Sequence, residues 1–292
     1  MSTEPVQAAS SASTPPLLAE LSESRAQGST RHIYDEIRRL SAVPMVALIW
    51  RHLATLPGAL EWAWSLLGPA MRAGAVQQVA AQLATQARVQ RRPAIPAAAL
   101  QAIGIGAADV RSITAVLDAY NRANPVNIVM VRCLSMLLAE APACTSTHVW
   151  PLWQPPAAPP ALPTMVDPAA MSPTVRAMVL LLTDRSAAAA PSTLWPSLYR
   201  HLAQWPAFLG LATVIVPPEF EAIDAVAVHL RDQVDLAAAE LAQHLPHRTD
   251  RPAPRPADPA ALLSAIHQFS GRIPEMVVIG NLLRDALPSD AE

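Results

Sequence analysis

A repeated phrase constrains the fold of this chain more than any other feature of its sequence. Residues 47–57 read ALIWRHLATLP, and residues 196–206 read PSLYRHLAQWP. The offset of 149 residues that places Arg51 on Arg200 also pairs other residues further along: Leu60 with Leu209, Pro69 with Pro218, Pro125 with Pro274 and Leu134 with Leu283. An ungapped offset over this length indicates a tandem duplication, which predicts two lobes related by a pseudo-two-fold axis.

The duplication divides the chain into four parts. Residues 1–30 are rich in Ser, Ala, Thr and Pro and are predicted to be a disordered, low-complexity N-terminus. Residues 31–142 form the first predicted helical repeat, and residues 176–290 form the second. Residues 143–175 between them are proline-rich, and since proline blocks helix formation we expect an extended, semi-rigid connector.

Composition and periodicity both predict an all-α fold. Hydrophobic residues make up 52% of the chain, but aromatic residues only 4%, and there are only 9 glycines. In residues 33–40 and 109–120, apolar side chains recur at three- and four-residue spacing, as on one face of a helix. Asp109 and Asp258 stand ahead of two corresponding helices, where we expect them to cap the helix or to favour its dipole.

Charge and hydropathy exclude several classes of function. All 21 basic residues are arginine, so chemistry that needs a lysine is absent, and a net charge of -2 gives no large basic surface for nucleic acid. No apolar stretch reaches about 18 residues, and no signal peptide opens the sequence. We therefore expect a soluble, cytoplasmic protein that binds neither nucleic acid nor membrane.

The two cysteines indicate neither a disulfide framework nor a metal site. Cys133 lies in an apolar run that reads IVMVRCLSMLL, and Cys144 lies near the connector. Cys133 is expected to be a small buried hydrophobic residue, with a nucleophile as the alternative. Nothing in the sequence requires a metal or another cofactor.

Three motifs carry a resemblance to a known family. YDEIRRLSAVPMVALIWRHLATLPGALEWAW (34–64), AYNRANP (119–125) and PSLYRHLAQWP follow one another in the chain. In this order they resemble motifs of the group I 2-haloacid dehalogenases, inverting enzymes that accept both enantiomers. The resemblance covers about residues 31–290. It implies an all-α fold in which two repeats form an intramolecular pseudo-dimer around a channel, with the chain knotted, and it suggests a homodimer.

The resemblance also implies a reaction, and one residue is missing for it. In the family a carboxylate acts as general base on a water, which displaces the halide from a small 2-haloacid with inversion. Asn124 matches the amide that positions this water, and Ser197 matches the serine before the base. Leu198 occupies the place of the catalytic Asp, and leucine accepts no proton.

Other residues could replace the base, but each has a structural interpretation as well. Asp184 aligns with Asp35 at the head of a helix and is expected to be solvated or capping. His52 and His201 occur at equivalent places, which favours a scaffold role over catalysis. Arg51 and Arg200 are expected to be surface or interlobe partners, with steering of an anionic ligand as the alternative.

Asn124 also has two interpretations that are compatible, since an Asn before a proline favours a helix-start turn. Met45, Leu48 and Tyr199 are expected to contact the substrate. The family has aromatic residues in the segment of Met45 and Leu48, so the resemblance implies a softer apolar wall here.

Three functions remain open on these grounds. The first is a dehalogenase or related hydrolase of small 2-haloacids. The second is a non-catalytic module that binds a short carboxylic acid. The third is a structural protein in which the channel is filled by leucine and methionine side chains.

Overall fold

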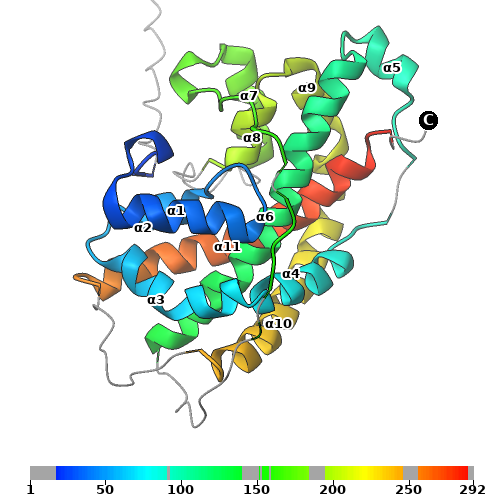
Figure 1. Ribbon diagram of the computed structural model, residues 1–292. Helices are drawn as coiled ribbons and strands as arrows, with labels where there is room; N and C mark the ends of the chain where they lie inside the picture. The colour runs from blue at the N-terminus through cyan, green and yellow to red at the C-terminus, as the bar shows by residue number, and fades with distance from the viewer. Residues whose placement is uncertain are drawn as a thin grey trace, which may run out of the picture.

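The computed structural model describes residues 18–90, 93–139, 151, 153–157, 159–183, 195–245 and 256–288. All regular secondary structure in these residues is helical, which confirms the predicted all-α class (Figure 1). The helices are α1 (Gly28–Ser41), α2 (Leu48–Leu53), α3 (Ala59–Arg72), α4 (Ala75–Gln86), α5 (Ala97–Ala102), α6 (Ala107–Ala139), α7 (Pro173–Thr183), α8 (Ser197–Leu202), α9 (Pro206–Ile215), α10 (Phe220–Ala242) and α11 (Pro259–Asp285). Three short 3-10 turns accompany them: η1 (Glu23–Arg25), η2 (Pro168–Ala170) and η3 (Pro217–Glu219).

The two longest helices, α6 and α11, pack against each other through the middle of the molecule (Figure 1). Their central segments are buried on almost every face, as expected for core helices. Each contains a buried proline, Pro125 in α6 and Pro274 in α11, although proline removes one backbone hydrogen bond from a helix. Packing in the core therefore outweighs this local penalty at both positions.

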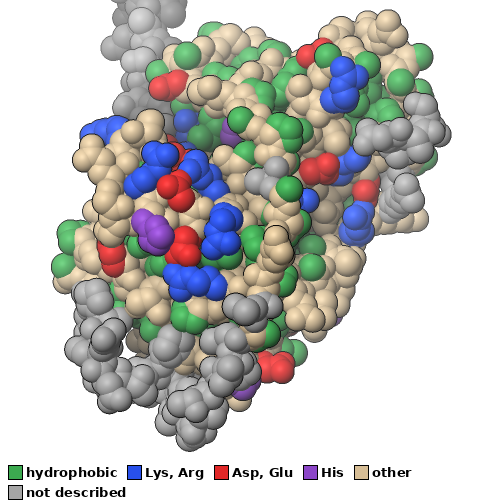
Figure 2. Space-filling view, in the orientation of Figure 1, with side chains coloured by type: hydrophobic (Ala, Val, Ile, Leu, Met, Phe, Trp, Pro, Cys, Tyr) green, Lys and Arg blue, Asp and Glu red, His purple; other side chains and the backbone are tan. Residues whose placement is uncertain are grey.

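Helix α1 illustrates how the sequence pattern divides inside from outside. Ile33, Ile37 and Leu40 are buried at the expected spacing. The other face is charged, and Figure 2 shows basic, acidic and histidine side chains gathered over α1 and α3. Glu36 in this group accepts a hydrogen bond from Arg72, with Nη2 and Oε2 2.6 Å apart, and this bond lowers the pKa of the Glu36 carboxyl.

The end of the predicted disordered N-terminus is placed differently by the structure. Helix α1 begins at Gly28, and the backbone N–H of Leu21 donates to the carbonyl of Arg51 at 2.9 Å. Tyr34 donates through its hydroxyl to the carbonyl of Leu21 at 3.0 Å. Long-range hydrogen bonds thus order residues 18–30 despite their polar composition, and residues 1–17 lie outside the described part.

The described part of the proline-rich connector has no helix before η2. Trp153 from this segment packs on Gly74, where a Cβ atom would lie 2.5 Å from the indole ring, and the backbone φ of Gly74 is 75°. Glycine is therefore required at position 74, both by the close approach of the indole and by the left-handed backbone. After the connector, helix α7 begins at Pro173, three residues before the predicted boundary at residue 176.

The order of elements after η1 resembles the order after η2. In both series a helix is followed by a six-residue helix, α2 in the first and α8 in the second. The series end on the long helices α6 and α11, each with its internal proline. Among the described residues, no helix is both long enough and apolar enough to span a bilayer.

Candidate functional site

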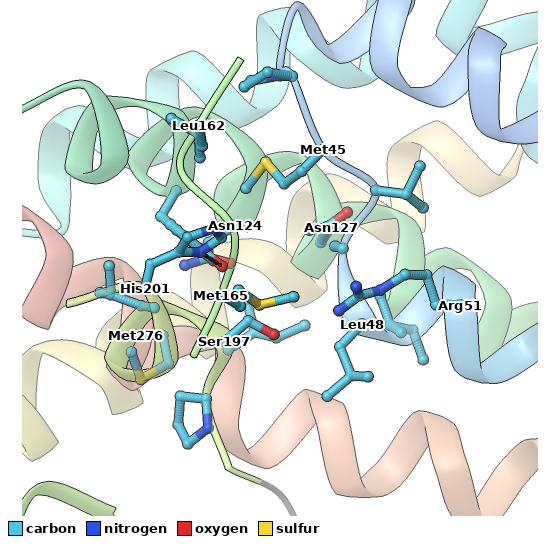
Figure 3. A pocket seen from close by; sticks show the side chains of 18 of the residues that line it. Met45, Leu48, Arg51, Asn124, Asn127, Leu162, Met165, Ser197, His201 and Met276 are labelled. Carbon is cyan, nitrogen blue, oxygen red and sulfur yellow. Dashed lines mark hydrogen bonds between the residues drawn. The ribbon is translucent and has the colours of Figure 1, made fainter. Parts of the chain in front are cut away.

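A cavity of about 310 Å³ lies where α2, α6, α8 and α11 meet the extended segment 161–165. Figure 3 shows side chains from these separate parts of the chain facing one space. Much of its wall is apolar: Val46, Ile49, Leu162, Met165, Phe269, Ile273 and Met276. The described residues thus leave this space open, unlike the filled channel of the third interpretation.

Five of the six predicted site residues meet in this cavity. Asn124, Ser197, Leu198, Met45 and Leu48 all line it. Tyr199 is the exception: it follows Leu198 directly in the chain but does not line the cavity. Its side chain is buried, at 1% exposure. Successive residues on a helix point about 100° apart, so Tyr199 is directed into the core while Leu198 borders the cavity.

Asn124 projects from the interior of α6 and is partly exposed. The helix continues through Pro125, so the alternative of a helix-start turn is wrong. Asn127 lies one turn away on the same face of α6 and accepts a hydrogen bond from Trp50 Nε1 at 2.8 Å. Within the described residues the amide of Asn124 has no such partner, which leaves it available to a ligand or a water in the cavity.

Ser197 and Leu198 begin helix α8, which contacts α6 beside the cavity. Leu198 is 1% exposed, and its side chain borders the cavity. Ser197 Oγ is buried and has no hydrogen-bond partner of good geometry in the described part of the chain. The position expected to hold the base is thus apolar, and it adjoins a hydroxyl that lies close to the hydroxyl of Tyr120.

His201 lines the cavity as well, which the sequence analysis did not predict. The ring is 4% exposed, and its Nδ1 is hydrogen-bonded to the Tyr120 hydroxyl at 2.9 Å. Burial lowers the pKa of His201 to about 4, and the charges of Arg51 and Arg200 act in the same direction. The imidazole is therefore neutral at pH 7.

The corresponding His52 has a different environment. Its Nδ1 lies 2.7 Å from the carbonyl oxygen of Ala19, and the ring is outside the cavity lining. The two histidines thus have different partners, Ala19 for His52 and Tyr120 for His201. His52 does have a scaffold role, because it holds the N-terminal segment against α2.

Two arginines face one carboxylate beside the cavity. Arg51 lines the cavity, is 6% exposed and has Nη2 3.0 Å from Glu20 Oε2. The other oxygen, Oε1, lies 3.8 Å from Arg200 Nη1. Arg51 of α2 and Arg200 of α8 are therefore linked through Glu20, which sequence reasoning missed because it lies in the low-complexity N-terminus.

Glu23 is the one acidic residue among the described residues that line the cavity. Both of its oxygens are engaged: Oε1 accepts from the backbone N–H of Val46 at 2.8 Å, and Oε2 accepts from Arg38 at 2.8 Å. Both oxygens are thus already used by donors of the protein, and neither is left to position a water. Asp184, the other acid considered from the sequence, lies outside the described residues.

Neither a reactive thiol nor a metal cluster is found in the described residues. Cys133 is buried in α6, and burial raises the pKa of its thiol to about 12, which agrees with a small hydrophobic residue. No group of three or more His, Cys, Asp or Glu side chains there could hold a metal ion. Cys144 lies outside the described residues.

Comparisons with known proteins agree with the resemblance found in the motifs. No family model matches the sequence. The chain is 28% identical over 207 residues to a configuration-inverting 2-haloacid dehalogenase of Alcaligenes xylosoxydans xylosoxydans, covering 68% of each chain.

Solved structures share the fold. A D-2-haloacid dehalogenase in complex with L-LA and a mutant D-2-haloacid dehalogenase in complex with D-2-CPA each superpose with a TM-score of 0.72 at 17% identity. Each match covers 94% of this chain and 95% of the other.

Proposed function

We infer that this chain, which belongs with the 2-haloacid dehalogenases in sequence and fold, binds a small carboxylic acid in its central cavity without hydrolysing it efficiently. The observation that carries this inference is the apolar Leu198, which lines the cavity next to Ser197 in the same cavity as Asn124. The polar groups suited to hold a ligand and a water are present. No carboxylate free to activate the water lies among the described lining residues, because Glu23 is engaged by Val46 and Arg38.

The chemistry sets the size of the expected defect. Displacement of a halide by water needs a base that removes a proton as the new carbon–oxygen bond forms. A positioned general base contributes about a hundredfold to ten-thousandfold to the rate. Because Leu198 cannot serve and Glu23 is engaged by Val46 and Arg38, hydrolysis loses this contribution.

Binding and turnover of 2-chloropropionate test the proposal together. Calorimetric titration of the full chain with each enantiomer should give a saturable heat. Chloride release, followed by ion chromatography at high protein concentration, should not exceed the rate without protein. Chloride release that grows in proportion to protein would overturn the proposal, and so would the absence of binding heat for both enantiomers.

A second candidate function is hydrolysis with His201 as the base. His201 is a neutral imidazole on the cavity wall at pH 7. It lies one turn after Ser197 on α8 and lines the same cavity as Asn124. Its low pKa makes it a weak base. If wild-type protein releases chloride, His201→Gln should abolish the release while His52→Gln preserves it, and equal activity of both variants would reject this role.

We also propose that the chain is a tandem duplication forming an intramolecular pseudo-dimer, with residues 31–142 and 176–290 as its halves. Equivalent backbone hydrogen bonds support this: Leu21 N–H donates to Arg51 O, and Val166 N–H donates to Arg200 O, at 2.9 and 3.1 Å. The knot implied by the resemblance belongs to the same proposal. A chain path in an experimental structure that pulls straight from its ends would contradict the knot.

A further inference from the structure

The buried guanidinium of Arg51 lacks a partner for one of its donors. Arg51 is 6% exposed, and its Nε is buried without a hydrogen-bond partner in the described part of the chain. Figure 3 shows the guanidinium pointing from α2 into the cavity. A buried donor on a charged group is costly to leave unpaired, so this site favours an acceptor that enters through the cavity.

The charges around Arg51 favour an anionic acceptor. Glu20 is the carboxylate that approaches both Arg51 and Arg200, at 3.0 and 3.8 Å. One negative charge thus faces two positive charges, which leaves this cluster with an excess of one positive charge. A carboxylate from a ligand would balance the charge, and its two oxygens suit the planar donor geometry of a guanidinium.

The rest of the cavity fixes the direction of such a ligand. Ser197 Oγ is buried close to the Tyr120 hydroxyl, and in Figure 3 the Ser197 hydroxyl lies on the side that faces Arg51. The space beyond is bounded by flexible apolar side chains, Met45, Met165 and Met276. Methionine walls adapt to an aliphatic chain without imposing one shape on it.

The cavity volume sets the length of the ligand. At about 30 Å³ for each water-sized group, a cavity of about 310 Å³ holds about ten non-hydrogen atoms. An unbranched acid of eight carbons has that many, whereas 2-chloropropionate leaves a substantial part of the space unfilled. Filling it with methylene groups gains hydrophobic free energy.

We propose that the preferred ligand is an aliphatic monocarboxylic acid of about six to eight carbons, with its carboxylate on Arg51 and its chain along the methionine wall. This rests on the proposed function, since it assigns the ligand of the same cavity. It adds the anchor residue and a chain length that short haloacids do not reach.

Calorimetric titration of the full chain at pH 7 with butanoate, hexanoate and octanoate tests the chain length. Each added methylene should tighten binding about fourfold, because burial of a methylene contributes about 0.8 kcal/mol. Octanamide, which has the same length without the charge, tests the anchor in unaltered protein. It should bind at least about tenfold more weakly than octanoate, because a charge-assisted bond to Arg51 is lost.

Two variants with matched chemistry separate the anchor from its surroundings. Arg51→Gln should weaken octanoate binding by about tenfold or more. Arg200→Gln removes the second positive charge facing Glu20 but no donor of the cavity lining, so it should weaken octanoate binding less than Arg51→Gln does. Circular dichroism and thermal melting establish that both variants are folded.

The outcomes distinguish the two proposals. If 2-chloropropionate and butanoate bind but octanoate binds no more tightly, this inference is overturned and the proposed function stands. Equal binding of octanamide and octanoate, or an equal loss in both arginine variants, overturns the role of Arg51. If no acid binds at all, both proposals are overturned.

Discussion

The short helices α2 and α8 carry the same Arg-His-Leu sequence but present different members of it to the cavity. In α2 the cavity is lined by Arg51, while His52 contacts the carbonyl of Ala19. In α8 it is lined by His201, while Arg200 lies outside the lining. Adjacent residues on a helix point about 100° apart. A different rotation of α2 and α8 about their axes is therefore enough to turn the arginine to the cavity in one helix and the histidine in the other.

This difference separates what a local sequence decides from what its surroundings decide. Both segments form a six-residue helix with a fully buried aromatic residue before the arginine, Trp50 in α2 and Tyr199 in α8. Trp50 is tied to α6 through Asn127. One repeated phrase therefore supplies a cation to one wall of the cavity and a neutral imidazole to the other.

The largest expected effect comes from a carboxylate placed on α8, compared with one placed at the corresponding position of α2. Leu198→Asp puts a base at the cavity wall next to Ser197, and burial raises the pKa of such a carboxyl toward a useful range. Chloride release from 2-chloropropionate should rise about a hundredfold or more over wild type. The rate is followed by ion chromatography with both enantiomers.

Ile49→Asp is the matched control, because Ile49 occupies the corresponding position in α2, is 1% exposed and lines the same cavity. It should produce no chloride. Leu198→Asn adds a second control for polarity without a base. Equal gains from the variants at positions 49 and 198 would show that the two helices are not chemically distinct.

The pH dependence of stability should differ between the two histidines. The His201 pKa of about 4 lies below the ordinary value near 6.5 because the ring is buried, and Arg51 and Arg200 oppose its protonation further. As the pH falls from 7, the unfolded chain takes up a proton at this ring before the folded chain does. Stability is therefore present above the unfolded pKa and lost toward pH 4, by about 2 to 3 kcal/mol at pH 4.5.

Urea unfolding at pH 7 and pH 4.5 measures this difference. The loss of unfolding free energy between the two pH values should be smaller in His201→Gln than in wild type by about 2 to 3 kcal/mol. His52→Gln, which removes the other histidine of the repeated phrase, is the control for loss of an imidazole from the chain. A His201→Gln variant with the same pH dependence as wild type would contradict the buried, neutral assignment.

The helical class and the placement of five of the six predicted residues around one cavity could be predicted from the sequence, because motif order and helical periodicity are local properties. It was insufficient where long-range contacts decide orientation. Tyr199 and His201 differ only by a rotation around α8, and Pro125 continues a helix that local preference would end. Glu20 and Glu23 lie in a segment whose polar composition gives no sign that arginines of distant elements hold it.

The smallest expected effect concerns the starts of the paired helices α6 and α11. Asp258 caps α11 by accepting from the backbone N–H of Ala261 at 2.9 Å, so Asp258→Ala should cost about 1 kcal/mol of unfolding free energy. Asp109 accepts from the backbone N–H of Gly106 and also from Trp205 Nε1, both at 3.0 Å. Asp109→Ala should therefore cost about 1 kcal/mol of unfolding free energy more than Asp258→Ala does. Urea unfolding of both variants, and of Asp109→Ala combined with Trp205→Phe, measures the added term. If the two alanine variants lose the same stability, the bond from Trp205 contributes nothing and the starts of the two helices are equivalent after all.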